Sequence, residues 1–242
     1  MSATVPEHQA TPASRAAAFA ETGLAAVLWA ALVIGSAVLA LTFPVYTSAA
    51  SQAVGVSQTA GIPGADVLRL SGQVRALVVD DEFDPLPSTF QGLPAFDAAA
   101  VSHLMDVRGV LGAARLATGI AALLLASYTG LCVMKGRVDR LRAGMRVAAL
   151  LCAVFVVLAV VAAFTDFSSF FAWFHGLFFK SGTWTFPAGS LLIRLFPVRF
   201  WELSGGAWGA LVLLGAGALL LASRLTRAAQ ARLFASRMAN NV

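Results

Sequence analysis

Hydrophobic residues in this chain fall into four long, mostly apolar stretches separated by segments that carry the polar residues. A helix needs ~20 mostly apolar residues to cross the hydrocarbon core of a bilayer. Each stretch approaches that length, and the third is almost purely aliphatic. We therefore predict an all-α membrane protein with four transmembrane helices, over residues 23–43, 116–134, 147–165 and 203–222.

The first stretch has an alternative interpretation as a secretory signal peptide. Small residues at positions 48–50 suit a signal peptidase. However, the apolar run is too long for the hydrophobic region of a signal peptide, and Arg15 is the one arginine or lysine ahead of it. We therefore interpret it as a membrane anchor that stops at Pro44.

Basic residues indicate the orientation in the membrane. The link between the second and third stretches holds five lysines and arginines against one acid, Asp139, and the C-terminal segment holds four arginines and no acid. Cytoplasmic segments of membrane proteins carry such an excess of Lys and Arg. This places both termini in the cytoplasm. The predicted cytoplasmic segments are the N-terminal tail 1–22, the basic loop 135–146 and the basic tail 223–242. The predicted extracytoplasmic segments are 44–115 and 166–202.

Composition agrees with a membrane protein, since 59% of the residues are hydrophobic, 12% are charged and the mean hydropathy is +0.80. The net charge of +5 follows from the topology and does not indicate a nucleic-acid partner. Cys132 and Cys152 fall near the inner ends of their helices, on the reducing side. They have no metal-ligand spacing, so we predict buried apolar cysteines and no metal site.

The first extracytoplasmic segment is predicted to form a partly helical cap. Residues 47–64 are rich in Ser, Ala, Gly and Gln and indicate a loose linker. Asp66 then caps an amphipathic helix, which ends at the acidic run 80–84. That run lacks the spacing of a calcium loop, so we interpret it as a solvated turn. Asp97 begins a helix that continues into the second apolar stretch; at ~55 Å it exceeds the ~30 Å bilayer core, so its outer third stands above the membrane.

The second extracytoplasmic segment is strongly aromatic. Ten of the chain's 24 aromatic residues lie between Phe164 and Phe186, with a single histidine among them. At helical spacing this histidine shares a face with four phenylalanines, and an apolar wall around an imidazole can tune a general base. An interfacial aromatic belt that includes a histidine is the alternative. The residues of this face are Phe171, Phe174, His175, Phe178 and Phe179.

A second histidine, His103, lies in the outer third of the long helix. Asp106 follows at i+3, so its carboxylate can share a face with the imidazole and orient it. A surface helix with ordinary polar groups is the alternative. Farther along, Arg194 and Arg199 lie in the aromatic segment, where they can anchor phosphate head groups or polarise a carbonyl.

Four short motifs follow one another between the predicted helices: His103-Leu-Met-Asp106-Val-Arg108, Phe174-His175-x-x-Phe178-Phe179, Trp184-x-Phe186 and Leu192-Ile193-Arg194-Leu195-Phe196-Pro197. In this order they resemble the bacterial lipoprotein intramolecular transacylases and their integral-membrane relatives. The resemblance spans nearly the whole chain. It implies a four-helix protein of the bacterial cytoplasmic membrane, with an extracytoplasmic cap, an active site on the outer side and no cofactor.

The resemblance also implies an activity. Members move the sn-2 acyl chain of a lipoprotein's diacylglyceryl group to the amine of its N-terminal cysteine, which gives the lyso-form lipoprotein. The expected partners are that lipidated cysteine and membrane lipids. Two histidines at the junction of cap and membrane carry the chemistry, and they match His103 and His175. Members also lead us to expect an acid shortly after the Trp-x-Phe motif, which residues 187–190 lack.

The residue types suit this chemistry without the family name. The chain has no G-x-S-x-G motif and no outward cysteine, so the economical nucleophile is the substrate's own amine, with pKa ~7.7–8.0. One histidine would act as base, and the other histidine or a nearby cation or indole N–H would stabilise the oxyanion. Aromatic side chains would exclude water. The alternative is a non-catalytic membrane protein whose cap binds lipid or a partner protein. The predicted orienting, oxyanion or substrate-binding residues are Asp106, Arg108, Trp184 and Arg194, and the predicted acyl pocket is Phe171, Phe174, Phe178, Phe179 and Phe186.

Overall fold

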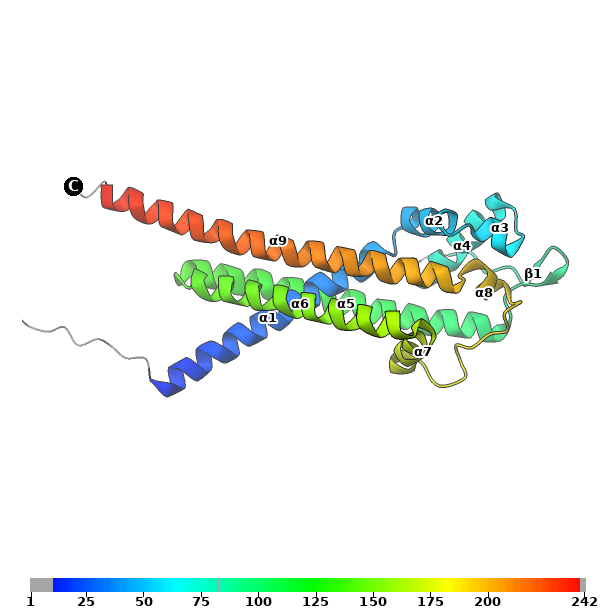
Figure 1. Ribbon diagram of the computed structural model, residues 1–242, viewed down its shortest axis with the longest axis horizontal. Coiled ribbons are helices and arrows are strands. Elements are labelled where there is room, and N and C mark those ends of the chain that lie inside the picture. The colour runs from blue at the N-terminus through cyan, green and yellow to red at the C-terminus, as the bar shows by residue number, and fades with distance from the viewer. Residues whose placement is uncertain (1–10, 82, 240–242) are drawn as a thin grey trace, which may run out of the picture.

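The computed structural model describes residues 11–81 and 83–239, with side chains described up to residue 228. Four of its helices are long and apolar enough to cross a membrane. They lie side by side in an elongated bundle, with the shorter elements gathered at one end and both described ends of the chain at the other (Figure 1). The predicted all-α membrane fold with four long helices is thus confirmed. These helices are α1 (Pro12–Ala40), α5 (Ala98–Met134), α6 (Val138–Thr165) and α9 (Val198–Ala239).

The helix boundaries follow from local capping signals. Asp97 caps α5 as the sequence predicts, because its carboxylate accepts a hydrogen bond from the Ala100 N–H at 2.7 Å. The helix then runs unbroken for 37 residues. Helix α1 starts at Pro12, ahead of the predicted span, because Thr11 caps it and Pro12 suits the first helical position. Pro44 does not end α1, which stops at Ala40; it begins the next helix instead.

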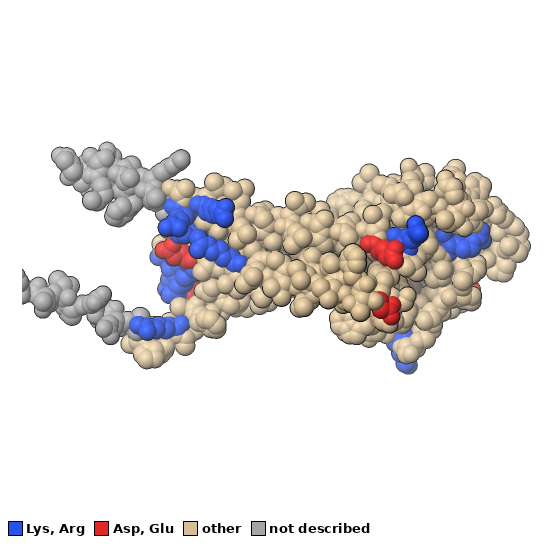
Figure 2. Space-filling view, viewed as in Figure 1, with Lys and Arg blue, Asp and Glu red and all other residues tan. Residues whose placement is uncertain are grey.

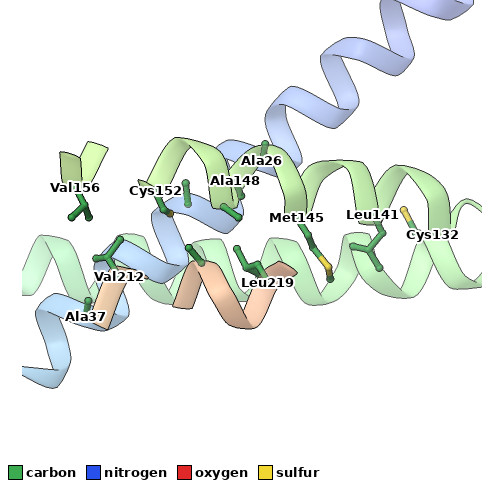
Figure 3. Close-up of a cluster of buried hydrophobic side chains, with 13 residues drawn as sticks. Ala26, Ala37, Cys132, Leu141, Met145, Ala148, Cys152, Val156, Val212 and Leu219 are labelled. Atoms are coloured by element: carbon green, nitrogen blue, oxygen red, sulfur yellow. The ribbon is translucent and has the colours of Figure 1, made fainter. Parts of the chain in front are cut away.

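Small residues form the interior of the bundle. The core cluster contains Ala26, Ala148, Cys152 and Val212, all fully buried, and lies where α6 packs against α1 and α9 (Figure 3). Leu141, Met145 and Leu219 are the large side chains of this cluster, and many other leucines of the long helices are exposed. Lipid is as apolar as a protein core, so membrane helices associate through close packing of small residues. Cys132 and Cys152 are buried here as free thiols, in keeping with their predicted role as apolar filler.

The end of the molecule opposite the two described chain ends is a separate small domain, which we call the cap. Its core buries larger side chains, among them Ile62, Leu70 and Leu195. A two-stranded antiparallel hairpin lies at its edge. The elements of the cap are α2 (Pro44–Ala53), α3 (Val56–Ala60), α4 (Gly64–Val79), β1 (Thr89–Phe90), β2 (Leu93–Pro94) and α8 (Leu191–Leu195).

The predicted loose linker over residues 47–64 is wrong, since α2 and α3 occupy most of it. Ala50 and Ser51 are almost fully buried, so the small side chains that indicated a linker instead allow α2 to pack closely. The turns on either side of α3 fall at Gly55 and Gly61, which have φ of 67° and 62°. This left-handed conformation carries no steric cost for glycine.

Three arginines fasten the C-terminal end of α4 to its neighbours. Arg108 donates to the carbonyl oxygens of Leu77 and Asp80, and Arg115 donates to that of Val79 at 2.7 Å. Arg75 binds the Asp80 carboxylate with both terminal nitrogens, at 2.7 and 2.9 Å. A helix leaves its last carbonyls without intrahelical partners, and guanidinium groups satisfy them here. The outer third of α5 is thereby held against α4.

Basic side chains gather at the end of the bundle opposite the cap, while the middle of the visible face shows none (Figure 2). Within this basic end, Glu21 of α1 forms ion pairs with Arg140 and, at 3.9 Å, with Arg137. These contacts join α1 to the first turn of α6 and to Arg137, which precedes it. The charge distribution therefore matches a multi-pass membrane protein with a positive side.

Candidate active site

Two imidazoles from distant parts of the chain face each other where the cap meets the bundle. His103 lies near the outer end of α5, and His175 lies near the end of α7 (Phe167–Phe178). Their ring centroids are 6.3 Å apart with an angle of 29° between the planes. Both are buried, with 7% and 9% of their surface exposed. The two histidines singled out in the sequence therefore share one site.

Helix α7 fixes one imidazole by a hydrogen bond. Asp166 caps the helix by accepting from the N–H groups of Ser168 and Ser169, at 3.0 and 3.2 Å. One turn before its end, His175 Nδ1 lies 2.9 Å from the carbonyl oxygen of Phe171. A carbonyl only accepts, so Nδ1 carries the proton and donates. Nε2 of neutral His175 therefore keeps its lone pair free.

Aromatic rings surround the pair. Phe179 and Phe186 lie 4.9 and 5.6 Å from His103, and Phe171 and Trp184 lie 4.0 and 4.8 Å from His175, measured between ring centroids. The predicted aromatic residues Phe171, Phe179, Trp184 and Phe186 thus come together around the imidazoles.

The other two phenylalanines of the predicted face lie mainly at the surface. Phe174 touches the edge of His175, with ring centroids 5.8 Å apart, and Phe178 packs on Phe174 at 5.2 Å. Their exposed fractions are 44% and 49%. Phe174 and Phe178 therefore lie at the rim of the site rather than between the two imidazoles.

Both imidazoles are held in the neutral form. Burial lowers the pKa of His103 below its ordinary value, the neighbouring His175 lowers it further, and the Asp106 carboxylate opposes this. Burial also lowers the pKa of His175, opposed by the hydrogen bond to the Phe171 carbonyl. His103 precedes the apolar part of α5, and His175 lies in α7, which is not one of the four long helices, so both groups lie outside the membrane-spanning segments. At neutral pH the site therefore offers two uncharged imidazoles.

Two buried polar atoms of the site have no hydrogen-bond partner among the described residues. They are Nδ1 of His103 and Nε1 of Trp184. A buried donor without a partner costs free energy, about 1–3 kcal/mol. Indole N–H is a donor only. The site is thus equipped to donate to an oxygen atom that a ligand brings.

The remaining predicted site residues lie elsewhere. Arg194 donates to the Ala60 carbonyl at 2.5 Å and joins α8 to α3, while Arg108 is bound to the carbonyls at the end of α4. Asp106 is exposed, and no hydrogen bond joins it to His103 within the described chain. Its effect on the imidazole is electrostatic only. The Phe171 carbonyl, which sequence reasoning missed, orients the other imidazole.

Two aspartates of the acidic run in the cap form ion pairs with arginine side chains. Asp80 accepts from Arg75, and the Asp81 carboxylate lies 3.6 Å from Arg108. Residue 82 lies outside the described residues. Residues 11–81 and 83–239 contain no group of three or more histidines, cysteines or acids that could hold a metal ion.

Comparison with known proteins places this chain in a family. The family model described as lipoprotein intramolecular transacylase Lit matches residues 23–201. No curated protein matches the chain by sequence. The crystallised lipoprotein intramolecular transacylase Lit from Bacillus cereus has a similar fold, with a TM-score of 0.78 over 90% of this chain and 99% of that one, at 14% identity.

Two further structures of the Bacillus cereus protein, with one histidine replaced by arginine or by alanine, give TM-scores of 0.73 at 14% identity. They cover 90% of this chain and 95% and 97% of theirs. The likeness of the solved structures concerns the fold, while the family model covers well over half of this chain. The chain belongs to the lipoprotein intramolecular transacylase family.

Proposed function

We propose that the protein moves the sn-2 acyl chain of a lipoprotein's diacylglyceryl group to the amine of the lipoprotein's own N-terminal cysteine. The observation that carries this proposal is the pair of buried imidazoles, with ring centroids 6.3 Å apart and aromatic rings around them, at the junction of cap and bundle. The family name and the named activity of the Bacillus cereus protein support the reaction class.

His175 is the general base in this proposal. Its Nδ1–H is held by the Phe171 carbonyl, so Nε2 is the acceptor that faces a substrate proton. The lowered pKa keeps Nε2 unprotonated at neutral pH. The cysteine amine, with a pKa of ~7.7–8.0, is close enough in acidity for such a base to deprotonate it during attack. The same carbonyl stabilises the imidazolium that forms.

His103 and Trp184 stabilise the oxyanion. Attack of the amine on the ester carbonyl gives a tetrahedral intermediate with a negatively charged oxygen, and N–H groups aimed at that oxygen lower the barrier. His103 Nδ1 and Trp184 Nε1 are the buried unpartnered atoms of the site. A neutral imidazole donates through its single N–H, so His103 fulfils this role without a positive charge.

The step balances without an enzyme nucleophile. A C–N bond forms between the amine and the acyl carbon, and the C–O bond to the glyceryl oxygen breaks. The proton taken by His175 Nε2 returns to the leaving glyceryl oxygen, which becomes a hydroxyl. The aromatic rings exclude water, and this favours attack by the amine over hydrolysis.

The orientation follows from the basic end of the bundle, which we place in the cytoplasm together with both termini. The site then opens at the outer side of the cytoplasmic membrane, where lipidated cysteines lie. A Ser88→Cys variant in the exposed edge of the cap is expected to react with an impermeant thiol reagent on intact cells. A Lys135→Cys variant in the basic loop is expected to react only after lysis, and the opposite pattern would place the site on the wrong side.

The reaction is tested by the mass of the product. Substrate and product are isomers, so a diacylglyceryl lipopeptide incubated with the protein should keep its mass while fragmentation shows one acyl chain moved to nitrogen. An acyltransferase that draws on phospholipid would add the mass of a chain, and a lipase would remove one. Either mass change contradicts the proposal.

A further inference from the structure

A groove lies at the cap end of the bundle, between the end of α2 and the first turns of α9. It has a volume of about 610 Å³. Trp201 of α9 points away from it, toward Phe171 of the histidine site, with ring centroids 6.0 Å apart. The groove is therefore separate from the imidazoles and belongs to another face of α9. Its lining residues are Ala53, Val54, Val198, Arg199, Glu202 and Leu203.

Arg199 differs from the other arginines of the outer half. Arg69 and Arg75 bind carboxylates. Arg108, Arg115 and Arg194 donate to backbone carbonyls. Arg199 has neither an ion pair nor a side-chain hydrogen bond within the described chain, although Glu202 lies at i+3 on the same face. Opposite charges at this spacing ordinarily pair on a helix. Here a free cation and a free carboxylate line one groove.

The groove lies at the depth of lipid head groups. Arg199 and Glu202 precede the apolar stretch that begins near Leu203. At the same level Tyr46 donates to Ser204 Oγ at 2.8 Å, and Trp201 is 40% exposed. Tyr and Trp mark the boundary between hydrocarbon and head groups in membrane proteins. A ligand here meets the two charged side chains together with the apolar side chains of Val54, Val198 and Leu203.

We propose that this groove binds the head group of a phospholipid with a primary ammonium, a phosphoethanolamine lipid of the outer leaflet. Arg199 binds the phosphate, because a guanidinium matches phosphate oxygens with two parallel N–H bonds. Glu202 accepts hydrogen bonds from the ammonium, which carries three donors. The bound lipid touches both α2 and α9, so it joins the cap to the bundle. This proposal does not depend on the acyl-transfer reaction.

The charge pair selects this head group over two others. A phosphoglycerol lipid carries a net negative charge with no ammonium, so Glu202 repels it. A phosphocholine lipid carries a quaternary ammonium, which has no N–H to donate to a carboxylate. Glu202 should therefore make the groove prefer phosphoethanolamine to phosphocholine. Arg199 should bind the phosphate of either lipid.

Native mass spectrometry of the purified full-length protein tests this. Protein in detergent is given equal amounts of phosphatidylethanolamine, phosphatidylcholine and phosphatidylglycerol, and the retained lipid is counted. We expect phosphatidylethanolamine to be retained preferentially, and Arg199→Gln to lower its retention about tenfold, as loss of a charged hydrogen-bonded contact does. Glu202→Gln should keep phospholipid retention but remove the preference for ethanolamine over choline.

Lys180→Gln is the matched control, because Lys180 is also an exposed outward cation without an ion pair in the described chain but lies outside the groove. It should leave retention unchanged. Equal retention of the three lipids by the unmodified protein, or an equal loss in Lys180→Gln and Arg199→Gln, would overturn the proposal. All three variants change exposed side chains, and matching unfolding temperatures will show that their folds are intact.

Discussion

The bundle and the cap bury different kinds of side chain, although one continuous helix, α5, belongs to both. The bundle interior is made mainly of Ala, Cys and Val with a few larger side chains, and most of its leucines are exposed. The cap buries Leu70, Ile62 and Leu195 in the manner of a water-soluble domain. Burial of a large apolar side chain gains free energy only where the alternative is water. The histidine site lies at this boundary, where an imidazole can be dry and still close to the water phase.

The largest expected effect concerns the site at the boundary. His175→Ala and His103→Ala should each lower the rate of lyso-form production by about 10²–10⁴-fold, because each removes a group acting directly on the reacting atoms. Membrane insertion should be unchanged. His8→Ala is the control, since residue 8 lies outside the described residues and outside the proposed site. Mass-spectrometric counting of amide-linked acyl chains measures the rate. Full activity in the His175 variant would remove the proposed base.

The comparison of cap and bundle predicts unequal costs for the same substitution. Leu70→Ala in the cap core, where Leu70 is fully buried, should lower the free energy of unfolding by about 2–5 kcal/mol. Leu150→Ala in α6, where Leu150 is 63% exposed, should lower the free energy of unfolding much less. The side-chain atoms that it removes contact lipid rather than the protein core. Thermal unfolding of the two variants in lipid nanodiscs measures the two losses of stability. Equal losses would show that the two regions are stabilised in the same way.

Close packing within the bundle can be tested on one helix. A Cβ at Gly215 of α9 would lie 2.6 Å from a methyl carbon of Val33, whose β-branched side chain has little freedom to move. Gly215→Ala should therefore destabilise the bundle by about 1–3 kcal/mol. Gly217→Ala is the control, because a Cβ there meets no atom within 4 Å. If Gly215→Ala were as stable as Gly217→Ala, the helices would not be in close contact at that point.

The smallest effect is a shift in titration. Positive charge on His175 lowers the pKa of His103, so His175→Phe, which keeps the site buried, should raise the pKa of His103 toward its ordinary value. In the unmodified protein both imidazoles should stay neutral as the pH falls through 6.5, because both pKa values are lowered. NMR titration of the histidine ring protons measures this. A midpoint of His103 that does not move would show that the rings do not interact.

Much of the fold could be predicted because its signals are local. Hydrophobic run length predicted the four long helices, and the Asp97 cap predicted the first residue of α5, since each depends only on neighbours in sequence. Helices α2 and α3 were missed for the opposite reason. Their small and polar residues show no helical hydrophobic periodicity. They are stabilised by burial of α2 against α4 and α9, and of α3 against α4 and α8.

The sequence by itself determined which chemistry was present: two histidines outside the predicted membrane spans, an aromatic segment and a chain without an obvious nucleophile. Only the tertiary structure decided how these groups are used. It brought the imidazoles of α5 and α7 together, gave the Phe171 carbonyl to His175, left the Trp184 N–H unpartnered, and engaged Arg108 and Arg194 with backbone carbonyls. The physical reason is that hydrogen-bond partners and pKa values depend on contacts between residues far apart in the chain, which no local pattern encodes.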